Sequence, residues 1–142
     1  MKFTRALILA SSLAFFACGD DESSTGPSND TADCSVTDGV KVVSPKGGEE
    51  FKVGETIKVV FGSDMDFGGF GVELRFDEGA KKVNLLDESI DDAKIDGKTC
   101  NEYSIKLDAE LGVVAADDAY IYVYPYSKQS KAGKSGTFKV KE

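Results

Sequence analysis

The stretch Phe70-Gly71-Val72-Glu73-Leu74-Arg75-Phe76 alternates between large apolar residues and other residues. Because side chains of a β-strand point to opposite faces in turn, the four large apolar side chains would share one face, with Glu73 and Arg75 on the other. A period of two is typical of a strand with one buried face. The segment at 56–61 repeats the pattern. The two segments together predict a sheet protein with a shared apolar core.

Turns of Gly, Asp, Asn and Lys separate similar short runs from about residue 36 onward. We expect strands at 40–43, 50–53, 56–61, 70–76, 82–86, 103–107, 119–126 and 137–140, with a weaker one at 93–95. Only residues 108–116 have the composition of a helical turn, and Gly112 weakens it. This pattern predicts an all-β domain: an Ig-like or fibronectin-III-like antiparallel β-sandwich of about seven strands, with a barrel as the minor alternative.

The first residues are organised like an export signal. Lys2 and Arg5 form a short positive segment directly before an apolar run at 6–16. A helical run of eleven residues spans about 16 Å, half of a bilayer core, so it predicts a signal peptide and not a membrane span. Ala17 stands directly before Cys18, which resembles the lipobox of bacterial lipoproteins. The resemblance implies a signal peptide at 1–17 and a diacylglycerol on the Cys18 sulfur; a plain secretory signal with an incidental cysteine is the alternative.

Residues 18–33 are predicted to be the lipidated cysteine and a flexible acidic linker. The segment at 19–31 has no large apolar residue, so it cannot bury enough surface to offset its ordering entropy. Its start, Asp20-Asp21-Glu22, resembles the surface-export signal of lipoproteins in some Gram-negative bacteria. We therefore expect the Ig-like domain at 34–142, lipid-anchored in the cell envelope, at the outer membrane or cell surface of a Gram-negative bacterium.

The chain is acidic, with 25 Asp and Glu residues against 17 Lys and Arg residues. Removal of 1–17 takes away Lys2 and Arg5 and leaves 15 of the 17 basic residues. Nucleic acids and anionic bilayers are bound by clustered cations, so this balance argues against a nucleic-acid partner. The expected contact with the membrane is the lipid on Cys18.

The cysteine count supports the same interpretation. Of three cysteines, lipidation uses Cys18 and leaves Cys34 and Cys100, which have one possible pairing in an oxidising compartment. A disulfide between them would close a loop of about 66 residues and stabilise the domain by roughly 3–5 kcal/mol.

Three segments resemble parts of one Ig-like family. Val43-Ser44-Pro45-Lys46-Gly47-Gly48-Glu49 and the segment at 53–59 resemble the opening of the N-terminal domain of the yeast cell-wall-synthesis family of Ser/Thr-rich GPI-anchored proteins, a domain that bacterial secreted proteins also carry. The segment at 135–140 is similar to its closing strand. The chain differs in having Phe61 at the usual Trp position and in lacking the long Ser/Thr-rich stalk. The resemblance covers about residues 40–140 and implies a non-catalytic envelope module without naming a ligand.

The composition also bears on catalysis and metals. The chain has no histidine, so it lacks the usual general base near neutral pH and the ligands of Cys/His zinc sites. We therefore expect no enzyme, no catalytic residues, no metal and no cofactor; a pair of carboxylates, as in glycoside hydrolysis, is the remaining catalytic alternative. Acidic pairs that could supply calcium ligands recur at 64–66, 77–78, 87–88, 91–92 and 117–118. A solvated acidic surface is the preferred interpretation of these pairs.

Four tyrosines stand at alternate positions: Tyr120, Tyr122, Tyr124 and Tyr126. In a strand they would share one side, with Ile121 and Val123 on the other. A flat exposed row of rings suits stacking on sugar faces, so the four tyrosines are the candidate ligand-binding residues. The simpler explanation is packing under neighbouring segments, with one of them making a tyrosine-corner contact.

A lysine-rich stretch follows the tyrosines, and a soluble hairpin loop is the preferred interpretation of it. Contact with an anionic polysaccharide is a minor alternative. Its lysines are Lys128, Lys131, Lys134 and Lys139.

We therefore expect an envelope-anchored lipoprotein whose non-catalytic Ig-like module binds cell-wall or other polysaccharide or has a structural role. The alternative is a protein–protein interaction, adhesion or spacer domain without sugar affinity. The expected partners are the membrane, through the lipid on Cys18, and either a polysaccharide or an envelope protein.

Overall fold

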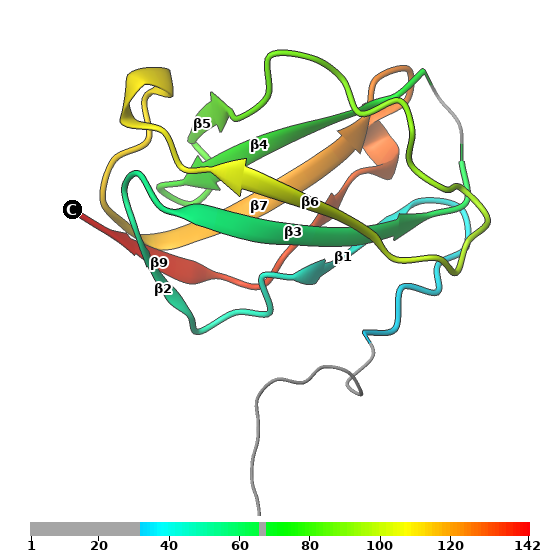
Figure 1. Cartoon of the computed structure of the whole chain (residues 1–142), viewed down its shortest axis with the longest axis horizontal. Coiled ribbons are helices and arrows are strands. Elements are labelled where there is room, and N and C mark those ends of the chain that lie inside the picture. The colour runs from blue at the N-terminus through cyan, green and yellow to red at the C-terminus, as the bar shows by residue number, and fades with distance from the viewer. Residues whose placement is uncertain (1–31, 66–67) are drawn as a thin grey trace, which may run out of the picture. The chain divides into compact units, whose positions relative to one another are not determined.

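The computed structural model describes residues 32–65 and 68–142 (Figure 1). The predictions for the signal peptide, for Cys18 and for the linker up to residue 31 lie outside these residues. Within the described part, strands dominate, and the helical elements are two short 3₁₀ turns, η2 (Ala109–Leu111) and η3 (Gln129–Lys131). The strands form two sheets packed face to face, which confirms the all-β sandwich.

The smaller sheet has three antiparallel strands in the order β1-β3-β6. The strands are β1 (Val40–Ser44), β3 (Thr56–Ser63) and β6 (Asn101–Lys106). Figure 1 shows this sheet as the front layer. The alternation in β3 has the predicted consequence: Ile57, Val59 and Phe61 are buried in the core, while Lys58 is exposed on the outer face.

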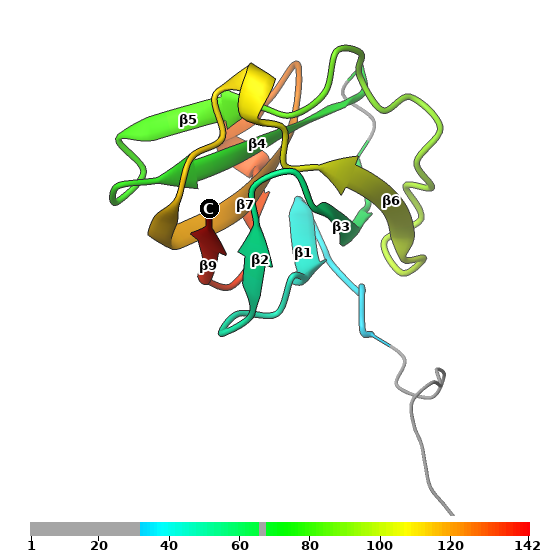
Figure 2. The same ribbon diagram turned by 60° about the vertical axis from the view of Figure 1, so that its left-hand side comes forward.

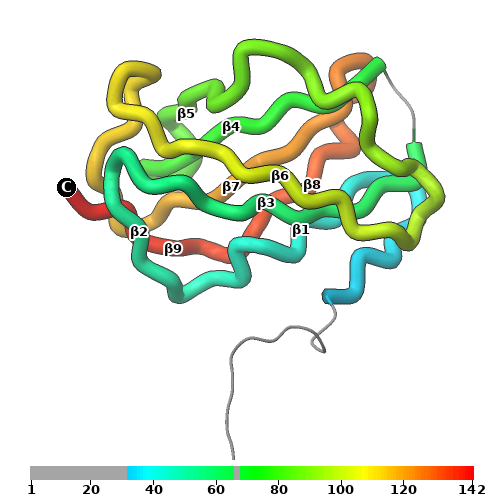
Figure 3. The backbone as a smooth tube through the Cα atoms, in the orientation of Figure 1, coloured from blue at the N-terminus to red at the C-terminus, as the bar shows by residue number. Residues whose placement is uncertain are grey.

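The larger sheet has the order β2-β9-β7-β4-β5, and the short strand β8 also pairs with β7. Its strands are β2 (Glu50–Lys52), β4 (Phe70–Phe76), β5 (Lys81–Asn84), β7 (Ala116–Pro125), β8 (Gly133–Lys134) and β9 (Phe138–Lys141). Figure 2 shows this layer from the side, with β5, β4, β7 and β9 facing β3 and β6. Figure 3 shows the last part of the chain running back along β7 through β8 and β9.

Three details differ from the sequence prediction. The pairing of β2 with β9 is parallel: after β1 the chain leaves the smaller sheet, and β2 joins the edge of the larger sheet beside β9. The expected weak strand at 93–95 is a loop, where the backbone N–H of Lys94 donates to the Asn101 side chain instead of to a strand partner. The two-residue strand β8 was not predicted.

The core lies between the inner faces of the two sheets. Phe61 packs with its ring centroid 5.2 Å from that of Phe70 and 6.0 Å from that of Tyr103. Other fully buried side chains come from both sheets and the loops: Leu74, Leu107, Ile121 and Phe138. Each buried side chain of this size contributes about 1.5–3 kcal/mol to folding, so this shared core holds the layers together.

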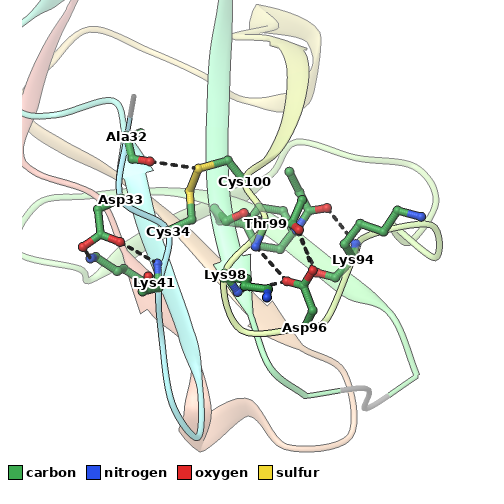
Figure 4. Close-up of a disulfide and its surroundings, with 12 residues drawn as sticks. Ala32, Asp33, Cys34, Lys41, Lys94, Asp96, Lys98, Thr99 and Cys100 are labelled. Carbon is green, nitrogen blue, oxygen red and sulfur yellow. Dashed lines mark hydrogen bonds and ion pairs between the residues drawn. A yellow bond between two sulfur atoms is a disulfide. The ribbon is translucent and has the colours of Figure 1, made fainter. Parts of the chain in front are cut away.

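Cys34 and Cys100 form a disulfide with their Cα atoms 5.2 Å apart, as the cysteine count predicts (Figure 4). Cys34 is almost fully buried, and Gly62 lets it lie against β3, because a Cβ on Gly62 would stand 2.1 Å from the Cys34 carbonyl oxygen. The bond ties the segment before β1 to the start of β6. Both cysteines belong to one compact unit, Ala32–Glu142, which contains the whole core.

Candidate functional site

The candidate site is the outer face of the larger sheet, where β7, β4 and β5 lie side by side. In β7, Ile121 and Val123 are fully buried in the core, so the residues between them point outward. The strand register places Tyr120 opposite Arg75, Tyr122 opposite Glu73 and Tyr124 opposite Gly71. We call this surface the tyrosine face: Gly71, Glu73, Arg75, Lys82, Asn84, Tyr120, Tyr122, Tyr124, Tyr126 and Lys134.

The four tyrosines differ in exposure. Tyr124 is 7% exposed, Tyr126 is 40% exposed, and Tyr120 and Tyr122 are half-buried. The Tyr124 ring lies directly on β4 because Gly71 has no side chain: a Cβ there would stand 2.4 Å from the Tyr124 Cζ. Burial, followed by the neighbouring Tyr126, raises the pKa of Tyr124. Tyr124 is therefore a packing residue of the outer face.

The Arg75 guanidinium lies over the Tyr122 ring. The Arg75 Cζ lies 3.5 Å from the ring centroid, a close cation–π contact. Glu73 holds the guanidinium there, with its Oε2 accepting from Nε at 2.9 Å and lying 2.8 Å from Nη2. Glu73 is 9% exposed although it lies on the outer face, which means that its neighbours cover it. Any ligand that contacts this part of the face meets the Arg75 guanidinium before the Tyr122 ring.

The rings do not form the flat row that sugar stacking would need. Tyr122 and Tyr124 are inclined by 35°, and Tyr124 and Tyr126 are nearly perpendicular at 81°. The cause is local: Gly71 draws one ring down onto the sheet, and Arg75 covers another. The prediction of a coplanar platform of four tyrosines is therefore wrong, whereas the alternation that puts the tyrosines opposite Ile121 and Val123 is correct.

One residue of the lysine-rich stretch, Lys134, lies beside the tyrosines. Strand β8 places Lys134 opposite Tyr122, and the Lys134 Nζ lies 5.5 Å from the Tyr120 ring centroid. On the other side of the face, β5 places Lys82 opposite Arg75. Lys131 is directed elsewhere, because it forms an ion pair with Asp38.

Sequence reasoning missed Glu73, Arg75, Lys82 and Asn84 as site residues. Their outward positions in β4 and β5 could be read from the alternation. What the sequence does not show is that β4 pairs with the tyrosine strand β7, and β5 with β4, which brings these residues beside the tyrosines.

The acidic loops use carboxylates to satisfy backbone amides. Asp64 accepts from the N–H groups of Asp38 and Gly39 at 2.6 and 3.0 Å, and these bonds lower its pKa. Asp118 accepts in the same way from the turn after β4, with the same effect on its pKa. Within residues 32–65 and 68–142 no group of three His, Cys, Asp or Glu side chains is placed to hold a metal ion.

A separate depression lies between 68–70 and the loop at 90–95. Among its described lining residues, Asp91 is the titratable one, and its Oδ1 accepts from the Ser89 hydroxyl at 2.7 Å.

No protein-family model matches the chain, and no curated protein is significantly similar to it. In the part of the chain that the structure describes, no helix is both long and apolar enough to cross a membrane.

Proposed function

We propose that this protein is a lipid-anchored, non-catalytic binding module of the bacterial cell envelope, and that its tyrosine face binds polysaccharide. The observation that carries the proposal is the composition of this face: the partly exposed rings of Tyr120 and Tyr126 lie on one sheet with the hydrogen-bonding groups of Arg75, Asn84 and Lys134. Sugars combine apolar C–H faces with a rim of hydroxyls, which suits such a mixture of rings and polar groups.

The inclined rings determine the mode of binding. A flat crystalline surface needs coplanar rings, which this face lacks. A single flexible glycan strand can instead contact Tyr120 and Tyr126 separately while the polar groups between them bind its hydroxyls. Tyr120, Arg75, Asn84 and Lys134 project from paired strands, and the Tyr126 backbone N–H, just past β7, donates to the Gly69 carbonyl at 3.0 Å. The backbone that carries these side chains is therefore fixed before the ligand arrives.

The anchoring part of the proposal rests on the N-terminal sequence, where Ala17 and Cys18 resemble a lipobox. The compact unit begins at Ala32, so residues 19–31 separate it from Cys18. A chain of this length reaches at most about 45 Å. The module would therefore sit outside the cytoplasm, within reach of wall or surface polysaccharides.

An interaction with an envelope protein is the second candidate, and one observation favours it. The steep angle between Tyr124 and Tyr126, with Arg75 on Tyr122, gives a corrugated Tyr- and Arg-rich surface. Tyr and Arg are enriched among the residues that dominate protein–protein binding.

The test uses the soluble chain of residues 19–142, which contains the complete compact unit. Affinity electrophoresis against neutral and acidic polysaccharides would compare it with Tyr120→Ala/Tyr126→Ala. The control is Ile95→Ala/Leu111→Ala, since both are exposed large apolar side chains that lie outside the strands. We expect retardation by a polysaccharide that the tyrosine variant loses and the control keeps, with unchanged circular dichroism. Absence of retardation by every polysaccharide, or equal loss in both variants, would contradict the proposal.

A further inference from the structure

The tyrosine face carries more cations than carboxylates, whereas the chain as a whole is acidic. The chain carries a formal net charge of −8. Yet three cations, Arg75, Lys82 and Lys134, lie around the tyrosines. Among the described residues, the carboxylates beside them are those of Glu73, which pairs with Arg75, and of Asp118, which accepts from the turn after β4. An acidic protein that gathers its cations beside its aromatic rings has a surface suited to an anionic ligand.

The cations extend across the sheet in register. Lys82 on β5 lies opposite Arg75 on β4, which lies opposite Tyr120 on β7, and Lys134 on β8 approaches Tyr120 from the other side. With neighbouring strands about 4.8 Å apart, β5 and β8 are separated by roughly 14 Å. This row is long enough to contact more than one charged unit of an extended chain.

Among the residues that the structure describes, two of the three cations have no carboxylate partner. Lys82 and Lys134 are exposed and form no ion pair within residues 32–65 and 68–142. Arg75 is paired with Glu73, which engages its Nε and Nη2, so the protons on Nη1 are still available to an acceptor. The nearby Asp118 accepts backbone N–H groups of the turn after β4.

We infer that the polysaccharide bound by the tyrosine face is acidic, with carboxylate-bearing sugar units. This inference rests on the proposed function and specifies its ligand class. Tyr120 and Tyr126 contact the sugar rings, Arg75 donates to a carboxylate, and Lys82 and Lys134 attract the flanking charges. The net negative charge of the rest of the chain opposes binding of a polyanion anywhere else, so binding is confined to this face.

The test measures the affinity of the 19–142 chain for polygalacturonate and for a neutral mixed-linkage β-glucan. The variant Lys82→Gln/Lys134→Gln removes the two unpaired cations. The matched control, Lys58→Gln/Lys106→Gln, removes the same charge from exposed positions on the outer face of the smaller sheet. We expect the first pair to lower the affinity for polygalacturonate about fivefold to tenfold and the control to leave it unchanged. Raising the salt concentration from about 0.05 to 0.3 M should weaken the binding of the parent chain.

The outcomes separate this inference from the proposed function. Binding to the neutral glucan that needs the tyrosines, with no affinity for polygalacturonate, would overturn the acidic ligand and leave the proposed function standing. Equal loss in both lysine variants would reduce the effect to general charge attraction and would also overturn the inference. Binding to neither polysaccharide in the unmodified chain would contradict both.

Discussion

Loss of the Cys34–Cys100 disulfide should lower the stability of the domain severely. The variant Cys34→Ala/Cys100→Ala opens a loop that spans a sequence separation of 66 residues. The chain-entropy relation assigns such a loop about 4 kcal/mol. For the roughly 110 residues of the compact unit Ala32–Glu142, the unfolding entropy near the melting temperature is about 0.23 kcal/mol per kelvin. The melting temperature should therefore fall by about 17 °C.

The assay is thermal unfolding of the 19–142 chain followed by circular dichroism, with and without a reducing agent. Reduction should lower the melting temperature of the parent chain toward that of the double variant, and the double variant should not respond to reduction. Ala keeps the Cβ atom and removes only the sulfur, which is buried at Cys34 and partly exposed at Cys100. A double variant that melts within about 5 °C of the oxidised parent would refute the argument that loop closure is a main source of stability.

Three further predictions concern packing, pH and anchoring. Gly71→Ala should destabilise the domain by about 1–3 kcal/mol, because its Cβ would overlap the Tyr124 ring; urea unfolding should show that the loss largely disappears in a Tyr124→Ala background. The Thr99 hydroxyl, followed by the Thr99 and Lys98 amides, lowers the pKa of Asp96 to about 2, so its stabilisation is complete above about pH 4 and is lost between about pH 4 and 2. The free energy of unfolding of Asp96→Asn, measured in urea, should accordingly depend less on pH over that range than that of the parent chain. An equal pH dependence in the two chains would contradict this. Cys18→Ser should move the protein from the membrane fraction to the soluble fraction, detected by immunoblot; an unchanged distribution would exclude lipidation of Cys18 as the anchor.

The strands were predictable because their signal is local. In β4 and β3 the apolar residues recur at every second position, and each of those side chains lies in the core. The parallel pairing of β2 with β9 was not predictable, because it joins segments from opposite ends of the domain. Alternation tells which side of a strand is buried, but it does not tell which strand lies beside it.

The candidate site shows the same division. The outward direction of Tyr120 and Tyr122 follows from the burial of Ile121 between them. The arrangement of the rings depends on Gly71, which lies opposite Tyr124, and on Arg75, which lies opposite Tyr120 and covers the Tyr122 ring. The pairing of β4 with β7, which are distant in sequence, brings these residues together. A one-residue shift in the pairing of β4 with β7 would have placed other side chains beside the tyrosines. The contact of Arg75 with the Tyr122 ring and the approach of Lys134 to Tyr120 could therefore not be predicted from the sequence.

The most direct test of the account locates the ligand on the domain. ¹⁵N-labelled chain of residues 19–142 would be titrated with a galacturonate oligosaccharide and, separately, with a neutral gluco-oligosaccharide, while amide chemical shifts are recorded by NMR. We expect saturable shift changes at 71–75, 82–84, 120–126 and Lys134, with none around Lys58 and Lys106 on the opposite sheet. Saturable changes confined to the smaller sheet or to the loops, or no changes with either sugar, would contradict the claim that the tyrosine face binds polysaccharide.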